Sequence, residues 1–176
     1  METANGIIIR IRKLTESSLI VTWCTEEWGV LKTVAKGARG PKSLFSGKLD
    51  LFVSAEIGWV RSRQSELHTL REMVVGSYRE SLRGDYSRTV MAAYFGELVE
   101  RAVEGESAIP KEHDLLKRAL DFLAGGGEVE RAFPFFEKEL ARILGVGDGR
   151  QGSLQLAEAL NGGFPRSRRE AARLAG

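Results

Sequence analysis

The 176-residue sequence predicts a β + α protein, with a small barrel of strands in its first part and a bundle of helices in its second. Two patterns support this prediction. Up to about residue 75, apolar residues alternate with polar ones in short runs rich in Ile, Val and Trp, as in half-buried strands. After Gly76, apolar residues recur every three or four positions, as on one face of a helix.

Five strands are expected in the first part. Alternating isoleucines mark the first, at residues 7–12, and a β-rich run marks the second, at residues 19–25. The other three are expected at residues 28–36, 49–60 and 66–72, and the short link at Glu26-Glu27 makes the second and third an antiparallel hairpin. Because so small a sheet must close to remove its edges, we expect a five-stranded barrel, of OB type by strand count or else SH3-like.

Four or five helices are expected in the second part. Asp85 or Ser87 can cap the first, which runs to about Val103, and Pro110 suits the first turn of the second. Further helices are expected at residues 128–144, 153–161 and 165–174. Pro134 should delay the start of the first of these three helices or bend it. The connection between the first and the second should be flexible, because it contains Gly145, Gly147, Gly149 and Gly152. We therefore expect an N-terminal OB-type barrel at residues 1–75, followed by a C-terminal helical bundle at residues 76–176.

The composition is that of an ordinary globular protein, with 43% hydrophobic and 28% charged residues. The single cysteine, Cys24, excludes an internal disulfide, and no His or Cys pattern indicates a metal site. No apolar run is long enough for a membrane span, and the N-terminus lacks the features of a signal peptide. We expect a cytoplasmic protein with no metal and no cofactor.

The positive charge is unevenly distributed along the chain. Residues 1–75 carry 11 Lys and Arg against 8 Asp and Glu, whereas residues 76–176 carry 15 against 16. The excess lies in residues 32–48, a stretch without acidic residues that is broken by glycines and a proline; its cations are Lys32, Lys36, Arg39, Lys42 and Lys48. Cations held in a stiff loop at the rim of a small sheet suit a phosphate backbone, although a solvated lysine loop is the alternative.

Single-stranded nucleic acid also binds through aromatic rings that stack on its bases. Most aromatic residues of the first part, including Trp23 and Trp59, fall on apolar strand faces and are expected in the core. Phe45 is the exception, because it lies within the basic stretch. We therefore include Phe45 among the candidate DNA-binding residues.

No pattern typical of an active site stands out. The sequence has no Walker-type or dinucleotide-binding glycine motif and no nucleophile elbow. The Glu26-Glu27 pair is expected to be a hairpin turn, Cys24 a buried strand residue, and His68 and His113 structural or exposed residues. We therefore expect a binding protein and not an enzyme. A nuclease is a further alternative, but it would require clustered carboxylates, and the sequence shows none.

Several of these motifs, taken in order, resemble the family of the recombination mediator RecO. The matching motifs of the first part are ESSLIVT at residues 16–22, TEEWG at 25–29, VAKGAR at 34–39, PKS at 41–43 and GKL at 47–49. In the second part, YFGEL at residues 94–98, the apolar stripe of residues 115–123 and FEKELARILG at residues 136–145 are similar to the helical domain of that family. The likeness covers about residues 7–145.

The resemblance implies an OB-fold followed by a helical domain, in a non-enzymatic mediator of DNA repair and recombination. It also implies binding to single- and double-stranded DNA, strand annealing, contact with RecR and with the C-terminal tail of the single-strand-binding protein SSB, and loading of RecA at the nucleoid. The family motif, matched residue by residue, implies that Lys36, Arg39 and Lys42 bind DNA. We add Lys32 and Lys48 because they carry charge in the same basic stretch.

Three features depart from the family pattern. Gly40 follows Arg39 where the family often has a second basic residue, and Pro134 and Phe135 stand where basic residues often precede the matching Phe-Glu. The residues after Gly145 include no cysteine, whereas many relatives have an insertion there, sometimes with a four-cysteine zinc site. We expect a short, zinc-free version with an altered SSB-tail anchor. The alternative is a protein-interaction adaptor that docks the SSB tail or RecR through its helical domain and binds little DNA itself.

Overall fold

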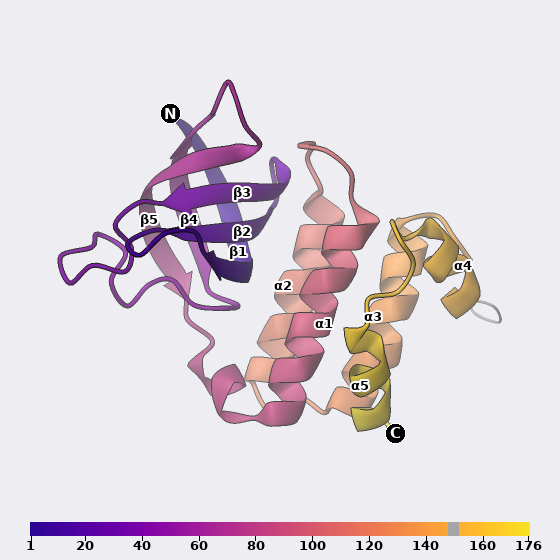
Figure 1. Cartoon of the computed structure of the whole chain (residues 1–176). Helices are drawn as coiled ribbons and strands as arrows, with labels where there is room; N and C mark the ends of the chain where they lie inside the picture. The colour runs from indigo at the N-terminus through magenta and orange to yellow at the C-terminus, as the bar shows by residue number, and fades with distance from the viewer. Residues whose placement is uncertain (148–151) are drawn as a thin grey trace. The chain divides into compact units, whose positions relative to one another are not determined.

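The computed structural model describes residues 1–147 and 152–176, and its first part is a closed five-stranded barrel (Figure 1). The strands are β1 (Glu2–Lys13), β2 (Leu19–Thr25), β3 (Gly29–Ala35), β4 (Ser54–Val60) and β5 (Leu67–Ser77). They lie in the order β1-β2-β3-β5-β4, and β4 returns to β1. All neighbouring strands are antiparallel except β3 and β5. This confirms the OB-type barrel that the sequence predicts.

The core of the barrel forms because alternate residues of its strands point inward. In β3, Leu31, Thr33 and Ala35 are fully buried, while the residues between them are partly exposed. Trp23 and Trp59 are the largest buried side chains and have no exposed surface. The indole Nε1 of Trp23 donates to the hydroxyl of Thr33 at 2.9 Å, which satisfies the one polar atom of that buried ring.

The fourth strand is shorter than the apolar alternation predicts. It begins at Ser54, whereas the sequence predicted a strand from residue 49. Phe52 has a φ of 69°, in the left-handed region, so the chain turns sharply just before the strand. Ile8 holds this corner on both sides, since its N–H donates to the carbonyl of Val53 at 2.9 Å and its carbonyl accepts from the N–H of Phe52 at 2.8 Å. The alternation at residues 49–53 therefore reflects a buried corner and not an extended chain.

Two other strands extend beyond their predicted ends. Strand β1 begins at Glu2, and an irregularity between Ile8 and Arg10 lets residues 2–7 pair with β4 while residues 6–13 pair with β2. Strand β5 continues to Ser77. The polar start of β1 has no apolar alternation, which is why the sequence did not reveal it.

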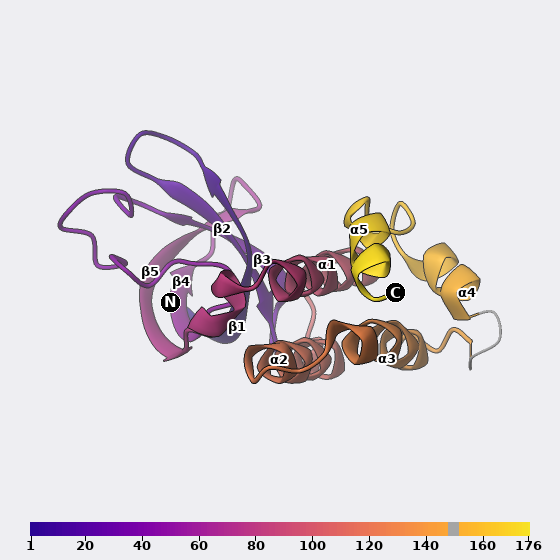
Figure 2. The same cartoon turned by 90° about the horizontal axis from the view of Figure 1, so that it is seen from below.

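The second part of the chain is helical, as predicted (Figure 2). After a 3-10 helix, Glu80–Gly84, come α1 (Tyr86–Ala102), α2 (Pro110–Ala124), α3 (Val129–Ile143), α4 (Gly152–Ala159) and α5 (Ser167–Leu174). Helix α1 packs against α2, α3 and α5, and α3 also packs against α2 and α4. Asp85 caps α1, because its carboxylate accepts from the N–H of Arg88 at 2.9 Å.

Pro134 does not delay the start of α3, which was one of its two expected effects. The helix begins at Val129 and contains Pro134 as its sixth residue. The backbone hydrogen bond that the proline removes is the one to the carbonyl of Glu130, and Glu130 is exposed, so water can satisfy that carbonyl. Of the predicted glycine-rich connection, Gly149 lies outside the described residues.

A buried charge cluster holds α5 to the other helices of this part. Glu137, 7% exposed, accepts from the hydroxyl of Tyr94 at 2.5 Å and from Nε and Nη2 of Arg168 at 2.8 and 3.1 Å. Burial, with the Glu137 carboxylate beside the phenol, raises the pKa of Tyr94 well above its ordinary value. The hydrogen bond to Glu137 raises the pKa of Arg168. The phenol thus keeps its proton and the guanidinium its charge.

Contacts divide the chain into two units. The barrel unit contains Met1–Tyr78 together with Gly105–Ile109, the segment between α1 and α2. The helical unit contains Arg79–Glu104 and Pro110–Gly176. No pattern in the sequence indicates that Gly105–Ile109 belongs with the barrel. Within the described ranges, no helix has the length and apolar character that a membrane span requires.

Candidate nucleic-acid interface

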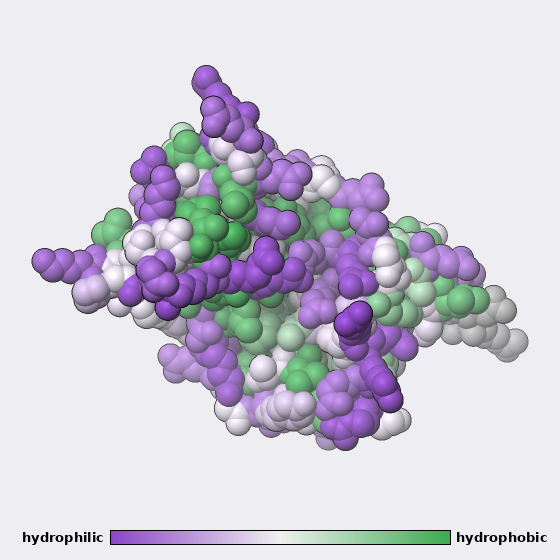
Figure 3. All heavy atoms as spheres, viewed as in Figure 1, coloured by the Kyte–Doolittle hydropathy of each residue, from purple (hydrophilic) through white to green (hydrophobic). Residues whose placement is uncertain are grey.

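The basic stretch forms a surface loop, residues 36–48, which we call the basic loop (Figure 1). It begins where β3 ends and consists of successive tight turns, such as the one closed by the N–H of Ser43 and the carbonyl of Gly40 at 3.2 Å. Gly37 and Gly47 have φ values of 69° and 73°, which residues with a side chain rarely adopt. The projecting loops of the barrel carry hydrophilic residues at their tips (Figure 3).

Phe45 anchors the basic loop from the inside. Its side chain is only 6% exposed and belongs to the barrel core together with Trp23 and Val53. A ring buried in this way presents no face to a base, which corrects the expectation that Phe45 stacks on nucleic acid. The neighbouring Leu44 is instead 77% exposed. The loop therefore offers charge on the surface and no aromatic ring.

The four predicted lysines keep their charges available. Lys36 and Lys42 are exposed, and Lys32 and Lys48 are partly exposed. In the part of the chain that the structure describes, none of the four forms an ion pair or a side-chain hydrogen bond. An exposed ammonium group without a carboxylate partner retains its full attraction for phosphate.

Arg39 differs from the lysines because its guanidinium already has partners. Nη1 donates to the backbone carbonyls of Glu16 at 3.2 Å and Thr15 at 3.4 Å, and the Arg39 N–H donates to the carbonyl of Ser17 at 3.1 Å. These contacts join the basic loop to the turn between β1 and β2. Arg39 therefore has a structural role, although its side chain remains exposed.

A second cationic segment lies in the hairpin between β4 and β5, where the sequence suggested only a polar turn. Arg61 and Arg63 are both exposed. The guanidinium of Arg61 lies 5.1 Å from the ring centre of Trp59 and 5.4 Å from that of Trp28. In OB-type barrels, this hairpin and the β1–β2 loop contribute to oligonucleotide binding. Two arginines within one short turn were the signal available in the sequence.

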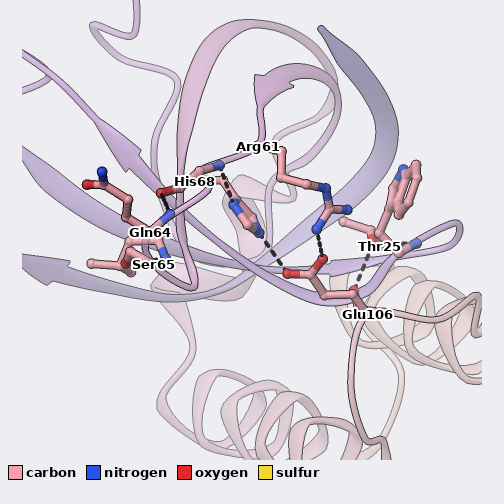
Figure 4. Close-up of polar contacts among 10 residues, drawn as sticks. Thr25, Arg61, Gln64, Ser65, His68 and Glu106 are labelled. Atoms are coloured by element: carbon pink, nitrogen blue, oxygen red, sulfur yellow. Dashed lines mark hydrogen bonds and ion pairs between the residues drawn. The ribbon is translucent and has the colours of Figure 1, made fainter.

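Glu106 connects this hairpin to the Gly105–Ile109 segment of the barrel unit (Figure 4). Its carboxylate accepts from Nε2 of His68 at 2.7 Å and also from the guanidinium of Arg61. Burial opposes the charge on Glu106, but the hydrogen bonds from His68 and Arg61 outweigh it and lower the pKa of the carboxyl. His68 itself is 2% exposed, so it is the structural residue that the sequence allowed for.

The other candidate chemical groups of the barrel have structural contacts. Glu27 lies in the β2–β3 turn, and its carboxylate accepts from the N–H of Asn5 at 2.9 Å and from the side-chain amide at 3.1 Å. Cys24 is buried in β2, as predicted. Among the described residues, no three or more His, Cys, Asp and Glu side chains are placed to hold a metal ion.

The helical unit carries an apolar pocket of about 330 Å³ on the surface of α2 and α3. Its lining residues are Arg118, Ala119, Phe122, Arg131, Ala132 and Phe135. Phe122 and Phe135 are 40% and 51% exposed, so both rings are accessible. Arg118 pairs with Asp114 at 2.8 Å. An apolar hollow lined partly by arginines suits a peptide that combines apolar and acidic residues.

Comparison with known proteins finds matches to most of the barrel unit and to part of the helical unit. Residues 1–78 match the family model described as "Recombination protein O N terminal", and residues 83–147 match the one described as "Recombination protein O C terminal". The chain belongs to the RecO family. The resemblance seen in the ordered motifs of the sequence is therefore confirmed.

Individual RecO relatives are similar over most of this chain. The identity is 36% over 141 residues with the DNA repair protein RecO of Vibrio cholerae, which covers 80% of this chain and 56% of that protein. With the DNA repair protein RecO of Salinibacter ruber the identity is 32% over 142 residues, and the match covers 80% of this chain and 55% of that protein. The chain thus spans little more than half the length of these relatives.

Proposed function

We propose that this protein is a non-enzymatic mediator of DNA repair and recombination that binds single- and double-stranded DNA in the cytoplasm. Membership of the RecO family supports the repair role, since its relatives are named DNA repair proteins. The observation that carries DNA binding is the basic loop. Lys36 and Lys42 are exposed on this loop without partners among the described residues, while the buried Phe45 side chain anchors the loop to the barrel core.

Binding in this proposal is electrostatic. Each cation that neutralises a phosphate releases condensed counterions, so the affinity falls by about 0.7 log units per log unit of salt for each single-strand phosphate contacted. Phosphate contacts position a protein on nucleic acid but carry no sequence information. The burial of Phe45 supports this mode, because it leaves no aromatic ring in the basic loop for a base.

The same chemistry supports strand annealing, because two strands with neutralised phosphates repel each other less. In the proposed function the protein acts with RecR and with the SSB C-terminal tail, and it helps RecA to load onto SSB-coated DNA. These partners come from the family, and each is part of the proposal.

Charge reversal of the two exposed lysines tests the proposal. The double variant Lys36→Glu, Lys42→Glu removes two phosphate contacts. Each contact raises the affinity by about 0.7 log units when the salt concentration is lowered from 1 M to 0.1 M. We expect the affinity for a labelled thymidine oligonucleotide to fall by about 25-fold or more. The control, Lys111→Glu with Lys138→Glu, makes the same change in net charge on exposed residues of the helical unit. Equal losses in the two double variants would contradict the proposed site.

The pocket of the helical unit supports a second function, that of an adaptor which docks the SSB tail or RecR and binds little DNA itself. An acidic, hydrophobic tail would place an apolar side chain against Phe122 and Phe135 and a carboxylate near Arg131. We expect Phe135→Asp to weaken binding of a labelled SSB tail peptide at least about tenfold, because a charge enters the apolar hollow. Leu154→Asp, at another exposed apolar position, is the control and should have no effect. Peptide binding without oligonucleotide binding by the unaltered protein would favour the adaptor.

A further inference from the structure

Arg61 and His68 together hold an anion that belongs to the chain itself, the carboxylate of Glu106. The His68 Nε2 lies 2.7 Å from one carboxylate oxygen, and the Arg61 guanidinium bonds to the other (Figure 4). The His68 side chain is 3% exposed, whereas those of Arg61 and Glu106 are 44% and 30% exposed. One donor is therefore built into the barrel, while the side chain of the carboxylate that it holds is partly exposed to solvent.

His68 is a fixed hydrogen-bond donor in this site. Its Nδ1 accepts from the backbone N–H of Ser62 at 3.1 Å, so Nδ1 carries no proton and Nε2 carries the proton that faces Glu106. The imidazole also lies against Trp59, with ring centres 4.8 Å apart. Any oxyanion that replaced the carboxylate would therefore meet a hydrogen already in place.

Arg61 is also held before any ligand arrives. Its guanidinium stands over both Trp28 and Trp59, whose rings meet edge to face with centres 5.7 Å apart. Trp28 is itself fixed, since its Nε1 donates to the carbonyl of Thr3 at 3.1 Å. A planar guanidinium suits the paired oxygens of a phosphate as well as those of a carboxylate.

The segment that supplies Glu106 has other attachments to the barrel. The N–H of Ile109 donates to the carbonyl of Glu26 at 2.9 Å, and Ile109 is 6% exposed. Gly29 allows the segment to approach closely, because a Cβ at this position would lie 2.9 Å from the carbonyl oxygen of Ser107. These attachments hold the backbone of the segment independently of the Glu106 side chain.

We propose that Glu106 occupies, in the free protein, a site that takes a phosphate of the nucleic acid in the complex. This inference rests on the proposed DNA binding and extends it from the basic loop to the β4–β5 hairpin. When a phosphate bonds to Arg61 and His68, the displaced carboxylate turns to solvent. Glu106 is thus a built-in competitor that lowers the affinity for DNA.

The substitution Glu106→Gln tests this, because it removes the charge and keeps the size of the side chain. We expect the full chain to bind a labelled thymidine oligonucleotide about threefold to tenfold more tightly, with a salt slope steeper by about 0.7. The matched control is Glu104→Gln, an exposed position two residues away with the same change in net charge. It should change the affinity by less than about twofold.

Adding Arg61→Gln to Glu106→Gln should abolish the gain, because the site then lacks its guanidinium. An equal gain from Glu104→Gln, or a gain that survives Arg61→Gln, would overturn the inference. Circular dichroism and thermal unfolding of each variant establish that the fold is retained.

A second probe separates this inference from the DNA-binding proposal. Tripolyphosphate has no base or sugar, and it should raise the Tm of Glu106→Gln more than that of the unaltered protein, provided that Arg61 is present. If tripolyphosphate acts in this way and no variant binds the oligonucleotide, the anion site stands and DNA binding fails. If tripolyphosphate stabilises the unaltered protein and Glu106→Gln equally, the anion site fails whether or not the oligonucleotide binds.

Discussion

Replacing Glu137 by alanine should strongly destabilise the helical unit. The Glu137 carboxylate, 7% exposed, receives hydrogen bonds from the Tyr94 hydroxyl and from two nitrogens of Arg168. Truncation leaves the buried Tyr94 hydroxyl without an acceptor and the Arg168 guanidinium without its counter-charge. Breaking a buried pair costs about 3–5 kcal/mol, and since Arg168 is 30% exposed, we expect the low end, about 3 kcal/mol.

Urea unfolding followed by far-ultraviolet circular dichroism measures this loss as a change in the free energy of unfolding. The matched control is Glu139→Ala on the same helix; the Glu139 side chain is 20% exposed, and its partner Arg142, which bonds to it at 2.9 Å, is 69% exposed. That pair is screened by solvent, so its loss should have little effect. A change for Glu137→Ala as small as that for Glu139→Ala would refute the reasoning, because the buried cluster would then contribute no more than a surface pair.

The basic loop and the Glu106 site give two further predictions. Phe45→Ala should cost about 3–5 kcal/mol of unfolding free energy because it leaves a cavity, whereas Leu44→Ala, at an exposed position, should change it by less than about 0.5 kcal/mol. Phe45→Leu should keep its affinity for the thymidine oligonucleotide, and a tenfold loss would contradict the core assignment. The pKa of Glu106 lies below its ordinary value of 4.5, so its charge stabilises the fold at neutral pH, and this contribution disappears as the pH falls through the lowered value. The difference in unfolding free energy between the unaltered protein and Glu106→Gln should be present at about pH 7 and should disappear as the pH falls through the lowered pKa of Glu106. A difference that keeps its full size in acid would contradict this prediction.

Local patterns predicted the parts of the fold that depend on neighbouring residues. Strand β2 has the bounds expected from its β-rich run, Asp85 caps α1 through its own carboxylate, and Pro110 begins α2. The corner at residues 49–53 could not be predicted in this way. The left-handed φ of Phe52 belongs to a turn whose hydrogen bonds run to Ile8, far away in the sequence.

In the candidate site, too, local sequence predicts some features, whereas others depend on contacts between distant residues. The charges of the basic loop are visible in the sequence, because lysines separated by glycines and a proline must lie at the surface. Whether Phe45 or Leu44 enters the core depends on how the loop meets the barrel, and no periodicity decides it. The contact between His68 and Glu106 joins residues 38 positions apart, one in a strand and one in a helix connection, so no spacing rule links them.

The salt dependence of DNA affinity tests most directly whether the lysines of the basic loop bind phosphates. With three to five single-strand phosphate contacts, the logarithm of affinity for the thymidine oligonucleotide should fall with the logarithm of salt concentration at a slope of about −2 to −3.5. In the Lys36→Glu, Lys42→Glu variant, the slope should be shallower by about 1.4. A flat response in the unaltered protein, or the same slope in both proteins, would contradict phosphate binding by this loop.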